Sequence, residues 1–267
     1  MEQLISGYPS TLYTGGKALD AALPAIAFIH GAAQDHSCWT LPSRWFAHHG
    51  HAVLAPDLPG HGSSRGTPLA TVEALADWIV ALQDALGIGQ AMLVGHSMGA
   101  LVALEAAARH ADRVSSLALI GASVPMPVSQ ALLDAARSDE PKARDMINAW
   151  SHSQRGHLGG NTVPGMWMLA TNHRLMERQP PGVLHTDLAA CHAYAGGAEA
   201  AATVTARRCP VLIIAGSRDL MTPARNTRQL AEMLPHATTV TLPGAGHAMM
   251  AEQPDALLDA LIGFARA

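Results

Sequence analysis

The sequence predicts an α/β fold in which a mostly parallel, doubly wound sheet is covered by helices on both faces. Short apolar runs, which are typical of parallel strands buried on both faces, alternate with longer amphipathic segments at both ends of the chain. Of the 267 residues, 49% are hydrophobic and only 14% are charged, which is enough for a large buried core. Alternating strands and helices in turn imply right-handed crossovers between parallel strands.

Six apolar runs are predicted to be strands of this sheet. They are Ala25–Ile29, Ala52–Ala55, Ala91–Val94, Val114–Ile120, Pro210–Ala215 and Thr238–Leu242. The helices expected around them are Thr71–Leu86, Met98–His110, Pro223–Leu234 and Pro254–Phe264. The first 14 residues are expected to form an edge hairpin.

The alternation stops between Val124 and Thr205, where no convincing strand is found. Helical stretches are expected there instead, at Ser129–Arg137, Pro141–Ser151, Pro164–Arg178 and Val183–Ala195. Prolines and glycines separate these stretches, so the segment is interpreted as a helical insertion and not as an independent domain. We therefore expect an α/β core of residues 1–123 and 206–267 that is interrupted by residues 124–205.

Charge, cysteine content and the N-terminus exclude several classes of protein. A formal net charge of −4 gives no basic surface for nucleic acid. Three cysteines are too few, and odd in number, for a disulfide framework, which favours a reducing compartment. Met1-Glu2-Gln3 does not resemble a signal peptide, and no apolar run approaches the ~20 residues of a membrane span. We expect a cytoplasmic monomer or homodimer that binds neither nucleic acid nor membrane.

One segment has the pattern of a nucleophile elbow. Gly95-His96-Ser97-Met98-Gly99 matches G-x-S-x-G and lies between a predicted strand and a predicted helix, the context that this motif requires. The glycines permit a tight turn that raises the Ser97 hydroxyl beside a helix N-terminus, where free N–H groups favour negative charge. With 24 glycines in the chain a chance match is the alternative, but the flanking strand and helix argue against it.

A serine nucleophile needs a base, and the base needs an orienting group. His247 lies in a glycine-rich loop after the last predicted strand, and Asp219 follows the strand Pro210–Ala215. Both positions are at carboxyl ends of strands, where open α/β sheets have their sites. A surface-loop histidine and a helix-capping aspartate are the alternatives. We predict a catalytic triad of Ser97, Asp219 and His247.

Two N–H donors are expected to form an oxyanion hole for the tetrahedral intermediate. The backbone N–H of Met98, directly after the nucleophile, is predicted to be one donor. The second is assigned to Ala32 in the segment His30-Gly31-Ala32-Ala33, which follows the strand Ala25–Ile29. Ala33 is the near alternative, and an ordinary turn without a function is the other interpretation of this segment.

These segments together resemble the α/β-hydrolase superfamily, in its single-domain branch with a lid, over nearly the whole chain. Ser97, Asp219 and His247 follow one another in the order that this superfamily uses. Further segments that carry the resemblance are His30-Gly31, Trp39, Asp57–Ser64, Gly216–Asp219 with Thr222-Pro223, and Gly244–His247 with Glu252-Gln253-Pro254. The resemblance implies an α/β-hydrolase fold with a helical lid inserted after the sixth strand.

The pattern looks like the carboxylesterase, lactonase, C–C-hydrolase and cofactor-free haloperoxidase relatives, so no cofactor is expected. Epoxide hydrolases and haloalkane dehalogenases of the superfamily use an aspartate nucleophile, and Ser97 argues against both. His61 is expected to have a packing role. The cluster His48-His49-Gly50-His51 has no nearby carboxylate or cysteine, so no metal site is expected there.

The substrate pocket is expected to be apolar, because the insertion is rich in methionine and tryptophan and few cationic residues flank the motifs. Its predicted lining residues are Trp39, Met126, Trp167, Met221 and Met249. The leading hypothesis is a serine hydrolase of small, mostly apolar carboxylic esters or lactones. Two alternatives use the same triad: a C–C hydrolase of ring-fission products, favoured if Arg174 or Arg155 points inward, and a perhydrolase. The third alternative is a non-catalytic ligand receptor.

Overall fold

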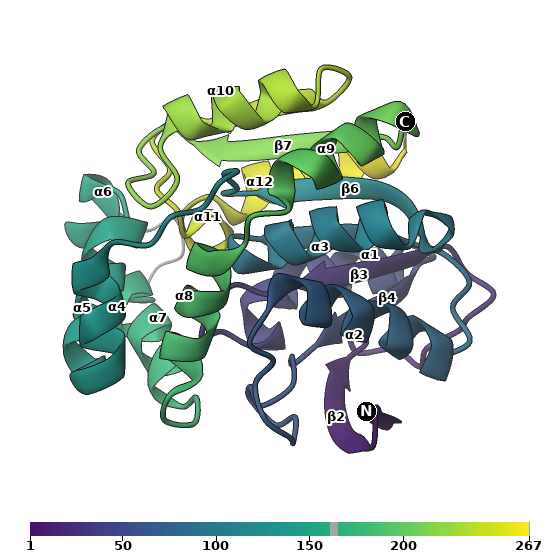
Figure 1. The fold of residues 1–267 in the computed structure, drawn as a ribbon, viewed down its shortest axis with the longest axis horizontal. Helices are drawn as coiled ribbons and strands as arrows, with labels where there is room; N and C mark the ends of the chain where they lie inside the picture. Colours follow the sequence, from purple (N-terminus) through teal and green to yellow (C-terminus); the bar gives the residue numbers. More distant parts are fainter. Residues whose placement is uncertain (161–164, 267) are drawn as a thin grey trace.

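The computed structural model describes residues 1–160 and 165–266 and confirms the predicted α/β class (Figure 1). The described residues contain one sheet of eight strands in the order β1-β2-β4-β3-β5-β6-β7-β8. The strands are β1 (Glu2–Ile5), β2 (Tyr8–Tyr13), β3 (Ala25–Ile29), β4 (Ala52–Pro56), β5 (Ala91–His96), β6 (Val114–Ile120), β7 (Val211–Gly216) and β8 (Thr238–Leu242). The expected hairpin is present as β1 and β2, which pair antiparallel, and from β4 to β8 all neighbours are parallel.

Side chains of successive strand residues enter two separate apolar layers, because they point to opposite faces of a sheet. In β3, Ala27 and Ile29 pack on the face covered by the helices α2 (Val72–Ala85), α3 (Met98–Arg109), α9 (Gly197–Ala206) and α10 (Ala224–Met233). Ile26 and Phe28 pack on the opposite face, against α1 (Thr40–His48), α11 (Met249–Glu252) and α12 (Pro254–Ala265). The two layers explain why the strands are apolar along their whole length.

The long connection between β6 and β7 contains the predicted insertion. Its first five helices are α4 (Gln130–Ser138), α5 (Glu140–Ser151), α6 (Gln154–His157), α7 (Met168–Glu177) and α8 (Val183–Ala193). We call α4–α8 the insertion helices; they lie together at one end of the sheet in Figure 1 and have their own apolar cluster. Of the predicted ranges, residues 161–164, including the expected helix start at Pro164, and residue 267 lie outside the described residues.

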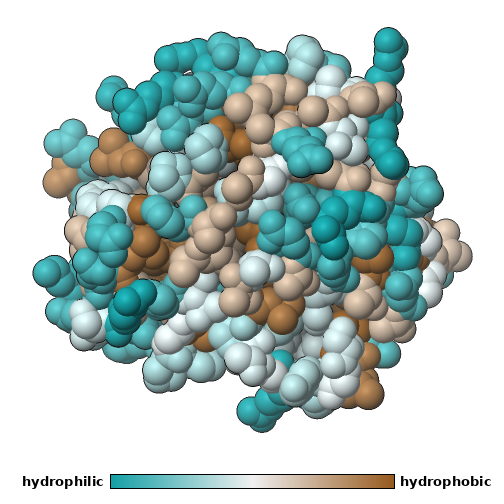
Figure 2. All heavy atoms as spheres, viewed as in Figure 1, coloured by the Kyte–Doolittle hydropathy of each residue, from teal (hydrophilic) through white to brown (hydrophobic). Residues whose placement is uncertain are grey.

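The sixth helix of this connection, α9, was not predicted as a separate helix. It packs against α3 through Ala200, Ala201 and Val204, and therefore covers the sheet and not the insertion helices. The 3-10 turns η1 (His36–Trp39) and η2 (Ala111–Arg113) complete the described elements. The surface is mixed: Figure 2 shows hydrophilic side chains gathered over α10 at the top. Among the described residues, no helix has both the length and the apolar composition needed to cross a bilayer.

Candidate active site

The segments singled out in the sequence meet at the carboxyl ends of the parallel strands. Ser97 directly follows β5, Asp219 follows β7, His247 follows β8 and Ala32 follows β3. Ser97, His247 and Ala32 line one cavity of about 440 Å³ between the sheet and the insertion helices. Asp219 is buried behind His247. Parallel strands bring these segments to one edge, although the chain separates Ala32 from His247 by more than 200 residues.

Ser97 occupies a strained turn with φ 53° and ψ −116°, a region that residues other than glycine rarely adopt. A Cβ atom on Gly95 would lie 2.1 Å from the carbonyl oxygen of Gly99, and one on Gly99 would lie 2.2 Å from the carbonyl oxygen of Ile29. The N–H of Ser97 donates to the carbonyl of Ile120 at 2.9 Å and holds the turn against β6. The G-x-S-x-G glycines are therefore required by the close approach of α3 to the strands.

Asp219 is placed to orient His247. Its Oδ2 atom lies 2.8 Å from Nδ1 of His247 and accepts the Thr222 hydroxyl at 2.7 Å, while Oδ1 accepts the N–H groups of Met221 and Thr222, both at 2.8 Å. Burial alone would raise the pKa of Asp219, but the charge of His247 and the hydrogen bonds outweigh it and lower the pKa. An ionised Asp219 favours a proton on Nδ1 of His247, so that Nε2 is the basic nitrogen.

The loop that carries His247 is held from two sides. On the core side, Nε2–H of His96 donates to the carbonyl of His247 at 3.0 Å. On the other side, the carboxylate of Glu252 accepts the N–H groups of Gly246 at 2.9 Å and of Ser153 at 3.2 Å, which joins the loop to the insertion. Sequence reasoning assigned no role to His96 or Glu252. Glu252 was noted as part of the family pattern, but its partner Ser153 lies 99 residues away.

Backbone geometry favours Ala32 over Ala33 as a free N–H donor. Leu58 donates its N–H to Nε2 of His30, so Nδ1–H of His30 donates to the carbonyl of Gly31 at 2.9 Å. In a planar trans peptide the next N–H points the opposite way, so the N–H of Ala32 faces away from His30. The N–H of Ala33, in contrast, already donates to Asp187 Oδ2 at 2.8 Å. Met98 begins α3, and its N–H has no acceptor within the helix.

A model of the alpha/beta hydrolase family matches residues 26–260. The chain belongs to this family. The resemblance noted in the sequence is thereby confirmed, and the hydrolases among its relatives support hydrolase activity for this α/β hydrolase.

Two relatives and two solved structures illustrate the likeness. A Caulobacter sp. (strain K31) protein named "Putative carbamate hydrolase RutD" is 32% identical over 79% of this chain and 80% of its own length. The pimeloyl-[acyl-carrier protein] methyl ester esterase of Chromobacterium violaceum is 29% identical over 82% of this chain and 84% of its own length. A Thermogutta terrifontis esterase has a TM-score of 0.84 at 22% identity, covering 100% of this chain and 97% of its own. The enol-lactonase of Burkholderia xenovorans LB400 has a TM-score of 0.83 at 23% sequence identity, and the match covers 100% of both chains. At these identities the structures support the fold alone.

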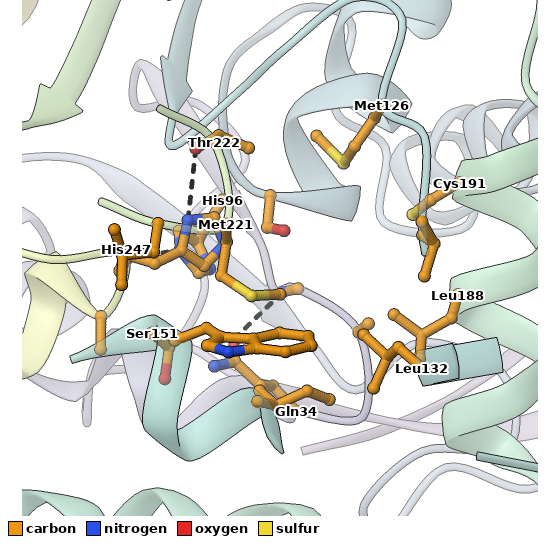
Figure 3. Close-up of a pocket in the computed structure, with 18 of the residues that line it drawn as sticks. Gln34, His96, Met126, Leu132, Ser151, Leu188, Cys191, Met221, Thr222 and His247 are labelled. Carbon is orange, nitrogen blue, oxygen red and sulfur yellow. Dashed lines mark hydrogen bonds between the residues drawn. The ribbon is translucent and has the colours of Figure 1, made fainter. Parts of the chain in front are cut away.

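Two of the five predicted pocket residues of this α/β hydrolase, Met126 and Met221, line the cavity (Figure 3). The other three predictions are corrected. Trp39 is fully buried in the layer beneath the sheet, 5.4 Å from the Phe28 ring, and Met249 is fully buried in the same layer. Trp167 is 65% exposed and lies over a separate surface hollow. Nearness in sequence to a motif suggested Trp39 and Met249, but the turn of each segment directs their side chains into the core.

The insertion helices supply most of the apolar lining that the sequence did not identify. These residues are Leu132 from α4, Ile147 and Trp150 from α5, and Leu188 and Cys191 from α8. Figure 3 shows Leu132, Leu188 and Cys191 at the end of the cavity away from His247 and Thr222. Burial raises the pKa of the Cys191 thiol, which therefore stays neutral. Among the described residues, no lysine, arginine, aspartate or glutamate lines this cavity.

A cluster of possible metal ligands lies outside the cavity. Asp35, His36 and Asp57 have donor atoms within 4.8 Å of one another. Each of these groups is already engaged, because Asp57 accepts from His36 Nδ1 at 2.7 Å and Asp35 accepts from Arg178 at 2.6 Å. Asp57 also accepts the N–H of Ser63 at 2.9 Å. These bonds make the cluster a scaffold for the loops beside the site.

Two buried histidines near the site should make the fold sensitive to acid. Burial lowers the pKa of His30 to about 4, assisted by the charge of His61, and lowers the pKa of His96 to about 3, assisted by His247. In the unfolded chain both should titrate near 6.5. Below that pH the unfolded state takes up protons that the folded state does not, so the free energy of unfolding falls as the pH falls from 6.5 toward 4.

We expect the two histidines together to cost roughly 3 kcal/mol of stability between pH 6.5 and pH 5. His36 and His61 oppose this fall only weakly, because their pKa values are raised: the folded state is already protonated, and the unfolded state becomes protonated just below pH 6.5. Urea unfolding at pH 7, 6 and 5 measures the effect as a falling midpoint. Equal midpoints at pH 7 and pH 5 would contradict the prediction.

Proposed function

We propose that this α/β hydrolase cleaves small, mostly apolar carboxylic esters or lactones through an acyl-enzyme on Ser97. The observation that carries this proposal is the meeting of Ser97 and His247 in one uncharged cavity, with Asp219 bonded to Nδ1 of His247 at 2.8 Å. A nucleophile, a base and an orienting carboxylate in this arrangement are the components of acyl transfer.

In the proposed reaction, Nε2 of His247 takes the hydroxyl proton of Ser97 as its Oγ attacks the ester carbonyl. The carboxylate of Asp219 stabilises the imidazolium that forms. The N–H groups of Met98 and Ala32 bind the oxyanion, and each such donor contributes roughly 2.7–4 kcal/mol to the transition state. The intermediate collapses, and the leaving alkoxide takes the proton from His247. Water then attacks the acyl-enzyme, with His247 again as base, and releases the acid and Ser97.

An ester is the scissile bond that we favour, because one relative, 29% identical to this chain, is named a methyl ester esterase. A lactone contains the same acyl–oxygen bond in a ring. Hydrolysis of an anionic ring-fission product would be favoured by a cation in the cavity. Arg155 and Arg174 instead line surface hollows outside it. A neutral lining favours a neutral acyl group.

The proposal is tested with the purified protein, p-nitrophenyl esters from acetate to decanoate, a panel of lactones and a fluorophosphonate label. We expect ester or lactone turnover and stoichiometric labelling of Ser97. Turnover of a dienoate ring-fission product without ester hydrolysis would favour C–C cleavage. Absence of both labelling and turnover would favour a ligand receptor.

Cys191 should limit the length of the acyl chain. Its side chain lies at the end of the cavity away from the triad, beside Leu188 (Figure 3). The substitution Cys191→Phe adds bulk there, so we expect kcat/KM for the octanoate ester to fall at least about tenfold while acetate is hydrolysed normally. Leu158→Phe, at a position that is 82% exposed, is the matched control. An unchanged ratio of octanoate to acetate hydrolysis would show that acyl chains do not reach Cys191.

A further inference from the structure

A buried ion pair that the proposed reaction does not use joins the insertion to the loop after β4. Asp187, on α8, and His61, in the loop after β4, are both almost completely buried, and Nε2 of His61 lies 2.8 Å from Oδ2 of Asp187. Nδ1 of His61 lies 3.0 Å from the carbonyl oxygen of Pro59. Both ring nitrogens therefore face acceptors, an arrangement that requires the doubly protonated imidazolium. Consistent with this, the carboxylate of Asp187 outweighs burial and raises the pKa of His61.

The same carboxylate oxygen accepts the N–H of Ala33 at 2.8 Å. Ala33 has φ 50°, in the left-handed region that costs a residue with a Cβ atom roughly 1–2 kcal/mol. A strained conformation of this kind persists only where surrounding contacts hold it. The Ala33 side chain provides a second contact, because it is fully buried in the apolar cluster of the insertion helices.

Ala32 is thus held on both sides. His30 binds the carbonyl of Gly31, and Asp187 binds the N–H of Ala33. These two bonds fix the peptide planes before and after Ala32, and therefore the direction of its N–H. The anchor on one side comes from the core, whereas the anchor on the other comes from a helix of the insertion, 154 residues further along the chain.

We infer that Asp187 is a positioning residue for the oxyanion hole: it holds Ala33, and through Ala33 it aims the N–H of Ala32 at the developing oxyanion. His61 supplies the counter-charge beside this buried carboxylate. The inference rests on the proposed function. It assigns the insertion a part in the chemical step, in addition to its part in lining the cavity.

The experiment compares Asp187→Leu, which removes the acceptor, with Asp187→Asn, which can keep an amide oxygen toward Ala33. For a p-nitrophenyl ester we expect the leucine variant to lose kcat about 10- to 100-fold, less than the complete loss of an oxyanion donor, with KM changed less than about twofold. The rate at which the fluorophosphonate labels Ser97 should fall in parallel. The asparagine variant should retain kcat within about threefold of the wild type.

Two further variants separate positioning from a structural role. Tyr194→Phe removes a different buried hydrogen bond between the β6–β7 connection and the core, in which the Tyr194 hydroxyl donates to Glu105 at 2.6 Å. This bond does not involve the loop of Ala32. It should lower the unfolding temperature and leave kcat unchanged. Asp187→Ser, whose hydroxyl is too short to reach Ala33, replaces the leucine variant if that variant does not fold, and should show the same loss of kcat.

A folded leucine or serine variant with wild-type kcat would overturn the inference, as would an asparagine variant as slow as the leucine variant, or an equal loss of kcat in Tyr194→Phe. Wild-type protein that neither hydrolyses the ester nor reacts with the label is a different outcome. It would overturn the proposed function itself, and with it the role assigned to Asp187.

Discussion

Replacement of Ser97 by alanine is expected to lower kcat for p-nitrophenyl butyrate by a factor on the order of 10⁴ to 10⁶. Without the hydroxyl there is no nucleophile for the acyl-enzyme, and only the oxyanion hole and substrate binding remain. The fold should be retained, because the Ser97 side chain makes no capping hydrogen bond to α3 and the turn is held by backbone bonds.

Ser138→Ala, at an exposed position on α4, is the control for this substitution. Circular dichroism and the unfolding temperature should be the same for Ser97→Ala and the wild type, and the fluorophosphonate label should no longer attach. If most of the butyrate hydrolysis persisted in Ser97→Ala, an acyl-enzyme on Ser97 would be excluded.

The substitution Asp219→Asn should lower kcat about 10⁴-fold without unfolding the protein. Oδ1 of Asp219 accepts the N–H groups of Met221 and Thr222, so the amide oxygen of asparagine would take this place. The amide NH₂ would then replace Oδ2 and face Nδ1 of His247. Nδ1 would have to accept a hydrogen bond, and the proton would move to Nε2, which is the nitrogen needed as base.

Steady-state kinetics at pH 7 measure this effect, with Asp259→Asn, an exposed substitution on α12, as the control. KM should change little, because Asp219 does not line the cavity. A loss of kcat smaller than about tenfold would mean that Asp219 is not the group that orients His247.

The strands were predicted well because their signal is local. β3, β6 and β8 have the predicted bounds, β4 and β5 end one and two residues later than predicted, and β7 begins and ends one residue later. A parallel strand buried on both faces must be apolar throughout, so the sequence itself marks where it begins and ends. Helix α9 was missed as a separate element, since alanine-rich residues 197–206 give no clear helical periodicity to distinguish it from the insertion.

The lining of the cavity was predicted poorly because it depends on packing between distant segments. Methionine and tryptophan indicate apolar surroundings but do not distinguish a core from a pocket. Trp39 and Met249 are in the core, whereas Leu132 and Cys191 line the cavity. No local pattern separates these cases, because the register of each helix against the sheet decides which side a residue faces.

By itself, the sequence determined the α/β class, the position of most strands and the order Ser97, Asp219, His247 along the chain. These features are set by residues close together: apolar runs, glycines at a tight turn, and polar residues directly after strands. Only the tertiary structure decided which N–H near Ala32 is free, which side chains line the cavity, and that Asp187 meets His61 and Ala33. Those outcomes depend on bonds that form only when segments more than 100 residues apart are packed together.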